Sequence, residues 1–169
     1  CNKSFLNVSL SSKNEHFYFL NNQLLINLHG DKTIYYASRD LDKIEIPSDI
    51  KRIADYSFYK CNLSSIVFPS DSILEEIGKK SIDSCNNLVQ ICLPSSLKII
   101  GKAAFNQCDQ LRIIELEENS QLKEIHRGAF SNTSIETLTF PDSLEYLEEG
   151  WCEKLSDFQD IKISSKNKN

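Results

Sequence analysis

The sequence predicts a repeat solenoid, mostly β with short helical turns, in which about six units of 22 to 25 residues stack along one axis. Three observations lead to this prediction. A strand-like block recurs at a nearly constant interval, and a second block follows it each time. Neither block is long enough to bury its own apolar face, so successive units must share one continuous core.

The first block reads as a short strand with apolar residues at its first, fourth and sixth places. Alternation of apolar and polar side chains is typical of a strand that is buried on one side. Proline follows four of the six copies and ends the strand, because it cannot donate another ladder hydrogen bond. The fourth-place residues are 22, 25, 23, 24 and 23 positions apart: Ile44, Ile66, Ile91, Ile114, Leu138 and Ile161.

The second block runs from a short extended piece into a turn or small helix. It carries one large apolar residue that we expect to fill the interior, preceded in most units by serine or alanine. Trp151 takes the place of that small residue in the last complete unit, which predicts a local distortion there. The interior residues of the five units are Phe58, Ile82, Phe105, Phe130 and Cys152.

The chain divides into three predicted parts. Residues 1–40 hold a partial repeat, with Phe5, Val8 and Leu10 on one strand, and an inserted β-hairpin or meander that acts as an N-terminal cap. Residues 41–163 form the solenoid, and residues 164–169 form a polar tail. Because the chain contains no methionine and begins at a cysteine, we expect it to be a piece of a longer protein.

The repeated pattern IxIPxx(x)LxxIgxxAFxxCxxL resembles the BspA-like leucine-rich repeat family, also called the Treponema pallidum type. "IEIPSDIKRIADYSFYKCNL" and "ICLPSSLKIIGKAAFNQCDQL" follow it almost throughout, and the resemblance covers roughly residues 41–163. Units two and five depart from it, at Ile82, Trp151 and Cys152. The resemblance implies a leucine-rich-repeat right-handed β-α superhelix. It also implies a surface or secreted protein of bacteria or parasitic protists that adheres to host matrix or cells.

Cys61, Cys85 and Cys108 hold the same place in three consecutive units, which predicts a column of thiols about 4.8 Å apart. The favoured interpretation is packing as small hydrophobic side chains. Zinc needs four convergent donors and usually closely spaced pairs, which the sequence lacks. A disulfide between neighbours stays an alternative, although parallel Cβ vectors disfavour it. We expect Cys92 to be an exposed free thiol and Cys152 to be buried.

Composition and motifs argue against several classes of function. A net charge of −5 with scattered lysines disfavours nucleic acid as a partner. No apolar run approaches the ~20 residues needed to span a membrane, so no membrane contact is expected within this segment. Nucleophile elbows, phosphate-binding glycine loops and metal-binding histidine pairs are absent from the sequence. We therefore expect no enzyme activity, no cofactor and no metal.

The outer face of the strands is the best candidate site, because solenoids commonly bind partners over such extended surfaces. Asn62 and Asn132, in turns between units, begin N-x-S/T triplets and are candidate glycosylation sites in a eukaryotic secretory pathway. The predicted partner-binding face consists of ten residues that alternate with buried ones: Lys43, Glu45, Ser65, Val67, Gln90, Cys92, Ile113, Glu115, Thr137 and Thr139.

The leading hypothesis is a non-enzymatic binding or adhesion module, surface-exposed or secreted, that binds a protein or glycan of the host or matrix type. Many weak contacts across repeated units would provide avidity. One alternative is an intracellular scaffold for protein–protein interaction, with reduced thiols and no glycans. Another is a passive spacer that holds a different domain away from the membrane. The oligomeric state and the ligand stay open.

Overall fold

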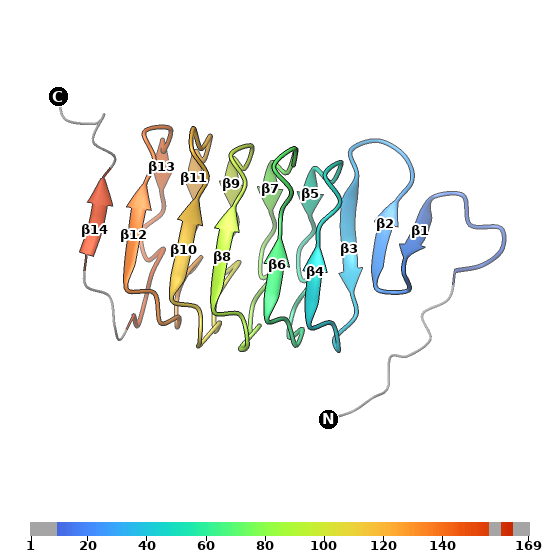
Figure 1. The fold of residues 1–169 in the computed structure, drawn as a ribbon, viewed down its shortest axis with the longest axis horizontal. Helices are drawn as coiled ribbons and strands as arrows, with labels where there is room; N and C mark the ends of the chain where they lie inside the picture. Colours follow the sequence, from blue (N-terminus) through green and yellow to red (C-terminus); the bar gives the residue numbers. More distant parts are fainter. Residues whose placement is uncertain (1–9, 156–159, 164–169) are drawn as a thin grey trace.

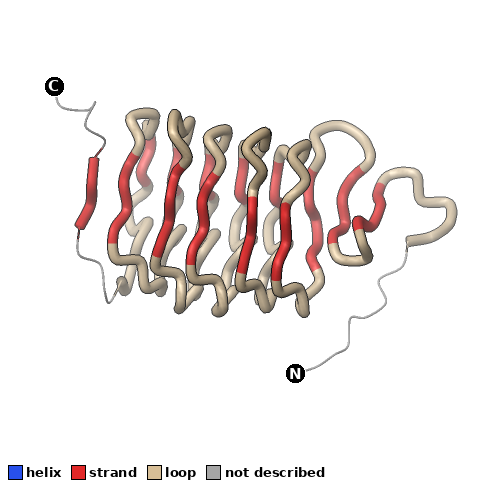
Figure 2. The backbone as a smooth tube through the Cα atoms, viewed as in Figure 1, coloured by secondary structure: helices blue, strands red, loops and turns tan. Residues whose placement is uncertain are grey.

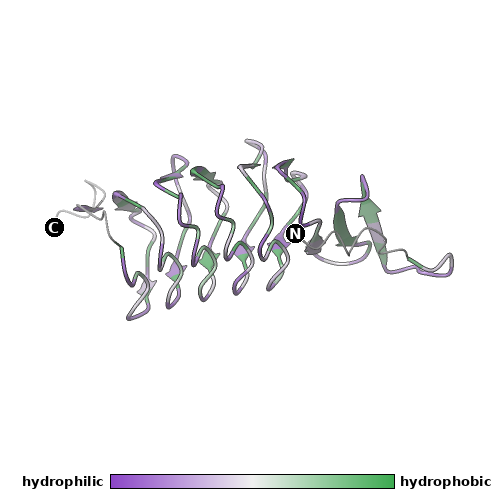
Figure 3. Cartoon of the chain, turned by 90° about the horizontal axis from the view of Figure 1, so that it is seen from below, coloured by the Kyte–Doolittle hydropathy of each residue, from purple (hydrophilic) through white to green (hydrophobic). Residues whose placement is uncertain are grey.

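The computed structural model describes residues 10–155 and 160–163 and is a β-solenoid of the leucine-rich repeat type (Figure 1). Each unit contributes one strand to a front wall and a shorter strand to a far wall, and the units repeat side by side along the long axis. The predicted fold class, a mostly β repeat solenoid, is confirmed. Figure 3 views the same stack from below, with consecutive coils following one another along the axis.

The front wall consists of parallel strands in the register that the repeat alignment predicts. Ile44 lies opposite Ile66, and Ile91 lies opposite Ile114. The strands from residue 43 to residue 140 show the alternating burial of a sheet with one covered face; in β8 the pattern is exposed, buried, exposed, buried. The front-wall strands are β4 (Lys43–Glu45), β6 (Ser65–Val67), β8 (Gln90–Leu93), β10 (Ile113–Leu116), β12 (Thr137–Phe140) and β14 (Asp160–Ile163).

The far wall is a continuous sheet in the order β1-β2-β3-β5-β7-β9-β11-β13. Its solenoid strands are only two residues long and pair in parallel, one unit to the next. Their bounds are β5 (Arg52–Ile53), β7 (Glu76–Ile77), β9 (Ile99–Ile100), β11 (Glu124–Ile125) and β13 (Tyr146–Leu147).

The N-terminal end of the far wall is the meander expected from the turn residues in this region. β1 (Phe17–Leu20) and β2 (Leu24–Asn27) form an antiparallel hairpin, and β3 (Thr33–Ala37) pairs antiparallel with β2 and parallel with β5. The sheet therefore passes without a break from the hairpin into the solenoid. The strand predicted around Phe5 and Val8, and the predicted polar tail at 164–169, lie outside the described residues, and the division of the chain at residue 40 stays a prediction.

The second block of each unit turns without forming a helix. The described residues contain strands and turns only (Figure 2), so the expected short helical turns are wrong for this part of the chain. The physical reason is two left-handed residues in every unit, four positions apart, which bend the backbone more sharply than a helix allows. The two sets are Tyr56, Lys80, Ala103, Gly128 and Gly150, then Lys60, Ser84, Gln107, Asn132 and Lys154.

The core is a continuous cluster that runs between the two walls. Phe58, Ile82, Phe105 and Phe130 are at most 1% exposed and occupy the interior as predicted. Their small neighbours are buried too, although the hydroxyls of Ser57 and Ser81 have no hydrogen-bond partner among the described residues. The expectation that Cys152 is buried is wrong, since it is half-buried in the last complete unit, where a smaller side chain stands in the place of phenylalanine. The local distortion expected at Trp151 stays a prediction.

Candidate binding surface

The front wall displays the residues that the sequence assigned to a partner-binding face. Nine of the ten side chains are exposed, and Ser65 is half-buried. Because ladder pairing places equivalent residues side by side, they form two columns along the wall: one through Lys43, Gln90 and Thr137, the other through Glu45, Cys92 and Thr139. The structure therefore brings these residues together on one surface.

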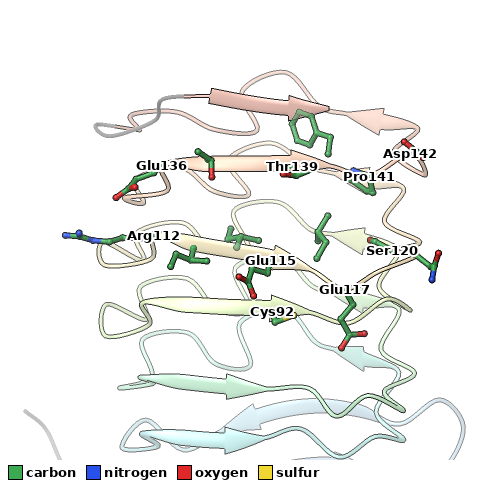
Figure 4. A pocket seen from close by; sticks show the side chains of 15 residues that line it. Cys92, Arg112, Glu115, Glu117, Ser120, Glu136, Thr139, Pro141 and Asp142 are labelled. Atoms are coloured by element: carbon green, nitrogen blue, oxygen red, sulfur yellow. The ribbon is translucent and has the colours of Figure 1, made fainter. Parts of the chain in front are cut away.

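This wall is hollowed by two adjoining depressions. One, of about 660 Å³, extends over β8, β10 and β12 (Figure 4), and the other, of about 460 Å³, extends over β6, β8 and β10. Cys92, Ile113, Glu115 and Glu117 line both. The two depressions therefore form one shallow groove, which we call the front groove, across four consecutive units.

The floor of the front groove is partly apolar. Val67 on β6 and Ile113 on β10 are large aliphatic side chains that are 49% and 46% exposed, and β8 lies between their strands. Glu115 lies beside Cys92 in the ladder, and burial together with Glu117 and Glu115 raises the pKa of the Cys92 thiol. Glu117 replaces the usual proline and accepts a hydrogen bond from the backbone N–H of Ser95 at 2.9 Å. The groove thus offers apolar contacts beside the exposed carboxylate of Glu115.

A seam in the front wall lies under this groove. The described front strands form two sheets, β4-β6 and β8-β10-β12-β14, with no ladder between β6 and β8. Sequence reasoning missed the seam, yet a signal existed: the interval from Ile66 to Ile91 is 25 residues, the longest of the five.

The three aligned cysteines pack in the interior, as the favoured interpretation predicted. Cys61, Cys85 and Cys108 are at most 2% exposed and are free thiols. The thiols of Cys85 and Cys108 donate to the carbonyls of Phe58 and Ile82 in the preceding unit, at 3.2 and 3.1 Å. Burial raises the pKa of all three, that of Cys108 to about 12. These thiols are protonated packing groups and not nucleophiles.

The candidate glycosylation sites differ in their surroundings. Asn62 is exposed, and its Oδ1 accepts a hydrogen bond from Asn87 at 2.8 Å. Asn132 is half-buried, and its own Nδ2 donates to Oδ1 of Asn106 at 2.9 Å. A glycan on Asn132 would have to displace that bond, so Asn62 is the better accommodated of the two.

Within residues 10–155 and 160–163, no group of three or more His, Cys, Asp or Glu side chains is arranged to hold a metal ion. In the same residues, no helix has the length and apolar character needed to cross a membrane.

Solved structures with a similar fold come from bacteria. The pneumococcal vaccine antigen PcpA matches 89% of this chain and 50% of its own, at 22% identity and a TM-score of 0.75. A leucine rich cell surface protein from Faecalibacterium prausnitzii matches 92% of this chain over 56% of its own length, at 15% identity and a TM-score of 0.52. A leucine-rich repeat protein from Eubacterium ventriosum matches 89% of this chain over 52% of its own length, at 17% identity and a TM-score of 0.58. The chain spans about half the length of these proteins.

At these identities the structural likeness shows the fold alone. No curated protein sequence matches the chain. A family model described as BspA type leucine rich repeat region does match it, over residues 30–168 and in six copies. The match agrees with the motifs, with the stacked units and with neighbours that are typically non-enzymatic repeat proteins. The chain belongs to the BspA-type leucine-rich repeat family.

Proposed function

We propose that this chain is a non-enzymatic binding module of a surface-exposed or secreted protein, and that its front groove holds a protein or glycan partner in adhesion. The observation that carries the proposal is the continuous front groove, in which the exposed apolar side chains of Val67 and Ile113, two units apart, lie beside carboxylates. Leucine-rich repeat domains generally mediate protein interactions, and one similar structure is that of a cell surface protein.

Binding to immobilised matrix proteins, such as fibronectin, laminin and collagen, and to a glycan array tests the proposal. The variant Val67→Asp/Ile113→Asp places two charges on the apolar floor and should abolish binding to whichever probe the chain recognises. Leu28→Asp/Ile73→Asp is the matched control, because Leu28 and Ile73 are equally exposed, at 46% and 50%, and lie outside the front groove. Equal binding by both variants would rule out the groove.

The intracellular scaffold and the passive spacer predict different results. A scaffold in a reducing compartment keeps its thiols reduced and Asn62 unmodified, so thiol counting under denaturing conditions and the mass of the native protein distinguish it. A spacer is replaceable by a neutral linker of the same reach without loss of adhesion. Loss of adhesion after that replacement supports the binding module.

A further inference from the structure

Charged side chains follow a regular pattern along the far wall. On the far wall, most charged side chains pair with a partner of opposite sign in the next unit. The ammonium nitrogens of Lys51 and Lys98 lie 3.8 and 2.8 Å from carboxylate oxygens of Glu75, one on each side. The ammonium of Lys123 lies 2.9 Å from a carboxylate oxygen of Glu145. Alternation of sign along the axis avoids the repulsion that like charges on adjacent strands produce.

One far-wall column breaks this alternation. Lys79, Lys102 and Arg127 occupy the same corner position, two residues after the short strand, in three consecutive units. We call these three residues the basic corner. Hydrogen bonds of 3.0 Å join each of their carbonyl oxygens to a backbone N–H of the preceding unit, from Tyr56, Lys80 and Ala103 respectively. The three side chains are therefore neighbours, and all three are exposed.

The two lysines of the basic corner form no ion pair among the described residues, although carboxylates lie nearby. Among the described residues, no carboxylate lies within 4.0 Å of the Lys79 or Lys102 ammonium, and Arg127 makes one exposed contact, to Glu153 at 3.6 Å. The nearest acids are occupied elsewhere. Asp55 accepts from the backbone N–H of Lys79 and from Arg52, and Glu148 accepts from the backbone N–H of Arg127 and from His126. Three adjacent cations thus remain available to an external anion.

An exposed aromatic side chain lies beside the first cation, next to Asp55, which holds the corner position of the preceding unit. Tyr56 precedes Lys79 by one unit, is 45% exposed, and has the Lys79 ammonium 5.9 Å from its ring centroid. The Tyr59 ring contacts the Tyr56 ring edge-on, with the two ring centroids 6.0 Å apart. The Lys60 ammonium lies 5.2 Å from the centroid of the Tyr59 ring. These contacts hold the Tyr56 ring at the surface beside the first cation.

We propose that the basic corner binds an acidic polysaccharide that lies along the solenoid axis, with sulfate or carboxylate groups on Lys79, Lys102 and Arg127 and a sugar ring on Tyr56. One cation per unit, with units about 4.8 Å apart, matches a polymer that carries an acidic group on successive sugars. The aromatic ring suits the apolar face of a sugar. This site lies on the far wall and does not depend on the proposed function of the front groove.

Nucleic acid fits this surface less well. Duplex DNA carries one negative charge per ~1.7 Å of axis, so it demands a wide basic footprint. Here the cationic column is one residue wide, exposed Asp55, Glu149 and Glu153 border it, and the whole chain has a net charge of −5. A single exposed ring also provides stacking for only one base.

The test measures binding of a fluorescent heparin oligosaccharide to the purified chain by anisotropy. The triple variant Lys79→Gln/Lys102→Gln/Arg127→Gln should weaken binding at least about tenfold, because three charge-assisted contacts are lost together. Tyr56→Leu should weaken it about threefold or more, while Tyr56→Phe should retain it, because the ring is kept. Melting temperature and circular dichroism verify that each variant is folded.

The matched control is Lys13→Gln/Lys154→Gln/Lys162→Gln, which removes the same charge from exposed positions outside both the basic corner and the front groove. It should leave the heparin affinity within about twofold, whereas equal losses in both triple variants would mean non-specific attraction and overturn the proposal. Tighter binding of a single-stranded oligonucleotide or of polyglutamate than of heparin also overturns it. Equal affinity for heparin and for a neutral polysaccharide of the same length does so as well.

Discussion

Phe105 illustrates how a single residue holds two units together. It is fully buried and stacks on Phe130 of the next unit, with ring centroids 5.5 Å apart and an interplanar angle of 13°. We expect Phe105→Ala to lower the free energy of unfolding by roughly 3 to 5 kcal/mol, because the cavity cannot close between stacked units. Urea denaturation measures the loss. Gln90→Ala, on the exposed front wall, should cost less than about 0.5 kcal/mol. Similar losses at both positions would contradict the assignment of inside and outside.

Glycine positions show where residue-level reasoning from sequence stops. Gly78 and Gly101 directly follow a far-wall strand in consecutive units, where the structure shows that they provide room and not a positive φ. A Cβ on Gly101 would lie 2.9 Å from backbone atoms of Gly78, Ile77 and Lys79, and neither glycine has a positive φ. His126 takes the same slot one unit later, where its ring lies between Glu124 and Glu148. Only the three-dimensional stack reveals such contacts.

The cysteine column acts as one element, because its thiols are buried in consecutive units. Their pKa values are raised, chiefly by burial, so the folded chain keeps protons that the unfolded chain releases near pH 8.5. The stability from these groups is complete below that pH and is lost as the pH rises toward the folded-state values. We expect the free energy of unfolding to fall by about 1.4 kcal/mol per pH unit for each thiol above pH 9.

Urea denaturation at pH 7, 9 and 10 measures this slope, and the upper limit keeps most lysines charged. Cys85→Ala/Cys108→Ala should flatten it by about two thirds, since two of three buried thiols are removed. Cys92→Ser is the matched control and should change the slope less than the double variant, because it removes one thiol from the exposed front wall in place of two from the core. An unchanged slope in the double variant would show that the column does not govern alkaline stability.

At the scale of elements, the sequence predicts strands better than turns. Period-two alternation located the front strands and their register, since a shift by one residue would expose Ile66 or Ile91. The left-handed corners were not predictable, because Tyr56, Lys80 and Gln107 are not residues that mark such a conformation. Backbone hydrogen bonds between units hold them there, and those bonds exist only once the units have stacked.

At the scale of the whole molecule, the sequence reveals the stack but not how charge is distributed over it. Basic residues that look scattered along the chain come together when Lys79, Lys102 and Arg127 take one corner position. The front groove likewise depends on a seam that no single unit contains. Such properties arise from the register between units, so the candidate surfaces could be predicted only as exposed strand faces.

A stack of units that contact only their neighbours should also unfold locally. Stability is then a sum of unit and interface terms, and damage to one unit spreads along the axis by nearest-neighbour contacts. We expect Phe105→Ala to accelerate amide hydrogen exchange most strongly in residues 76–130, which form its own unit and the adjacent ones. Exchange in the hairpin, residues 17–27, should change far less, because several units lie between. Mass spectrometry of peptic fragments from wild type, Phe105→Ala and the surface control Gln90→Ala measures this profile. If protection fell equally from the hairpin to β13, the chain would behave as a single cooperative globule, and the view of the molecule as a series of independently contacting units would be wrong.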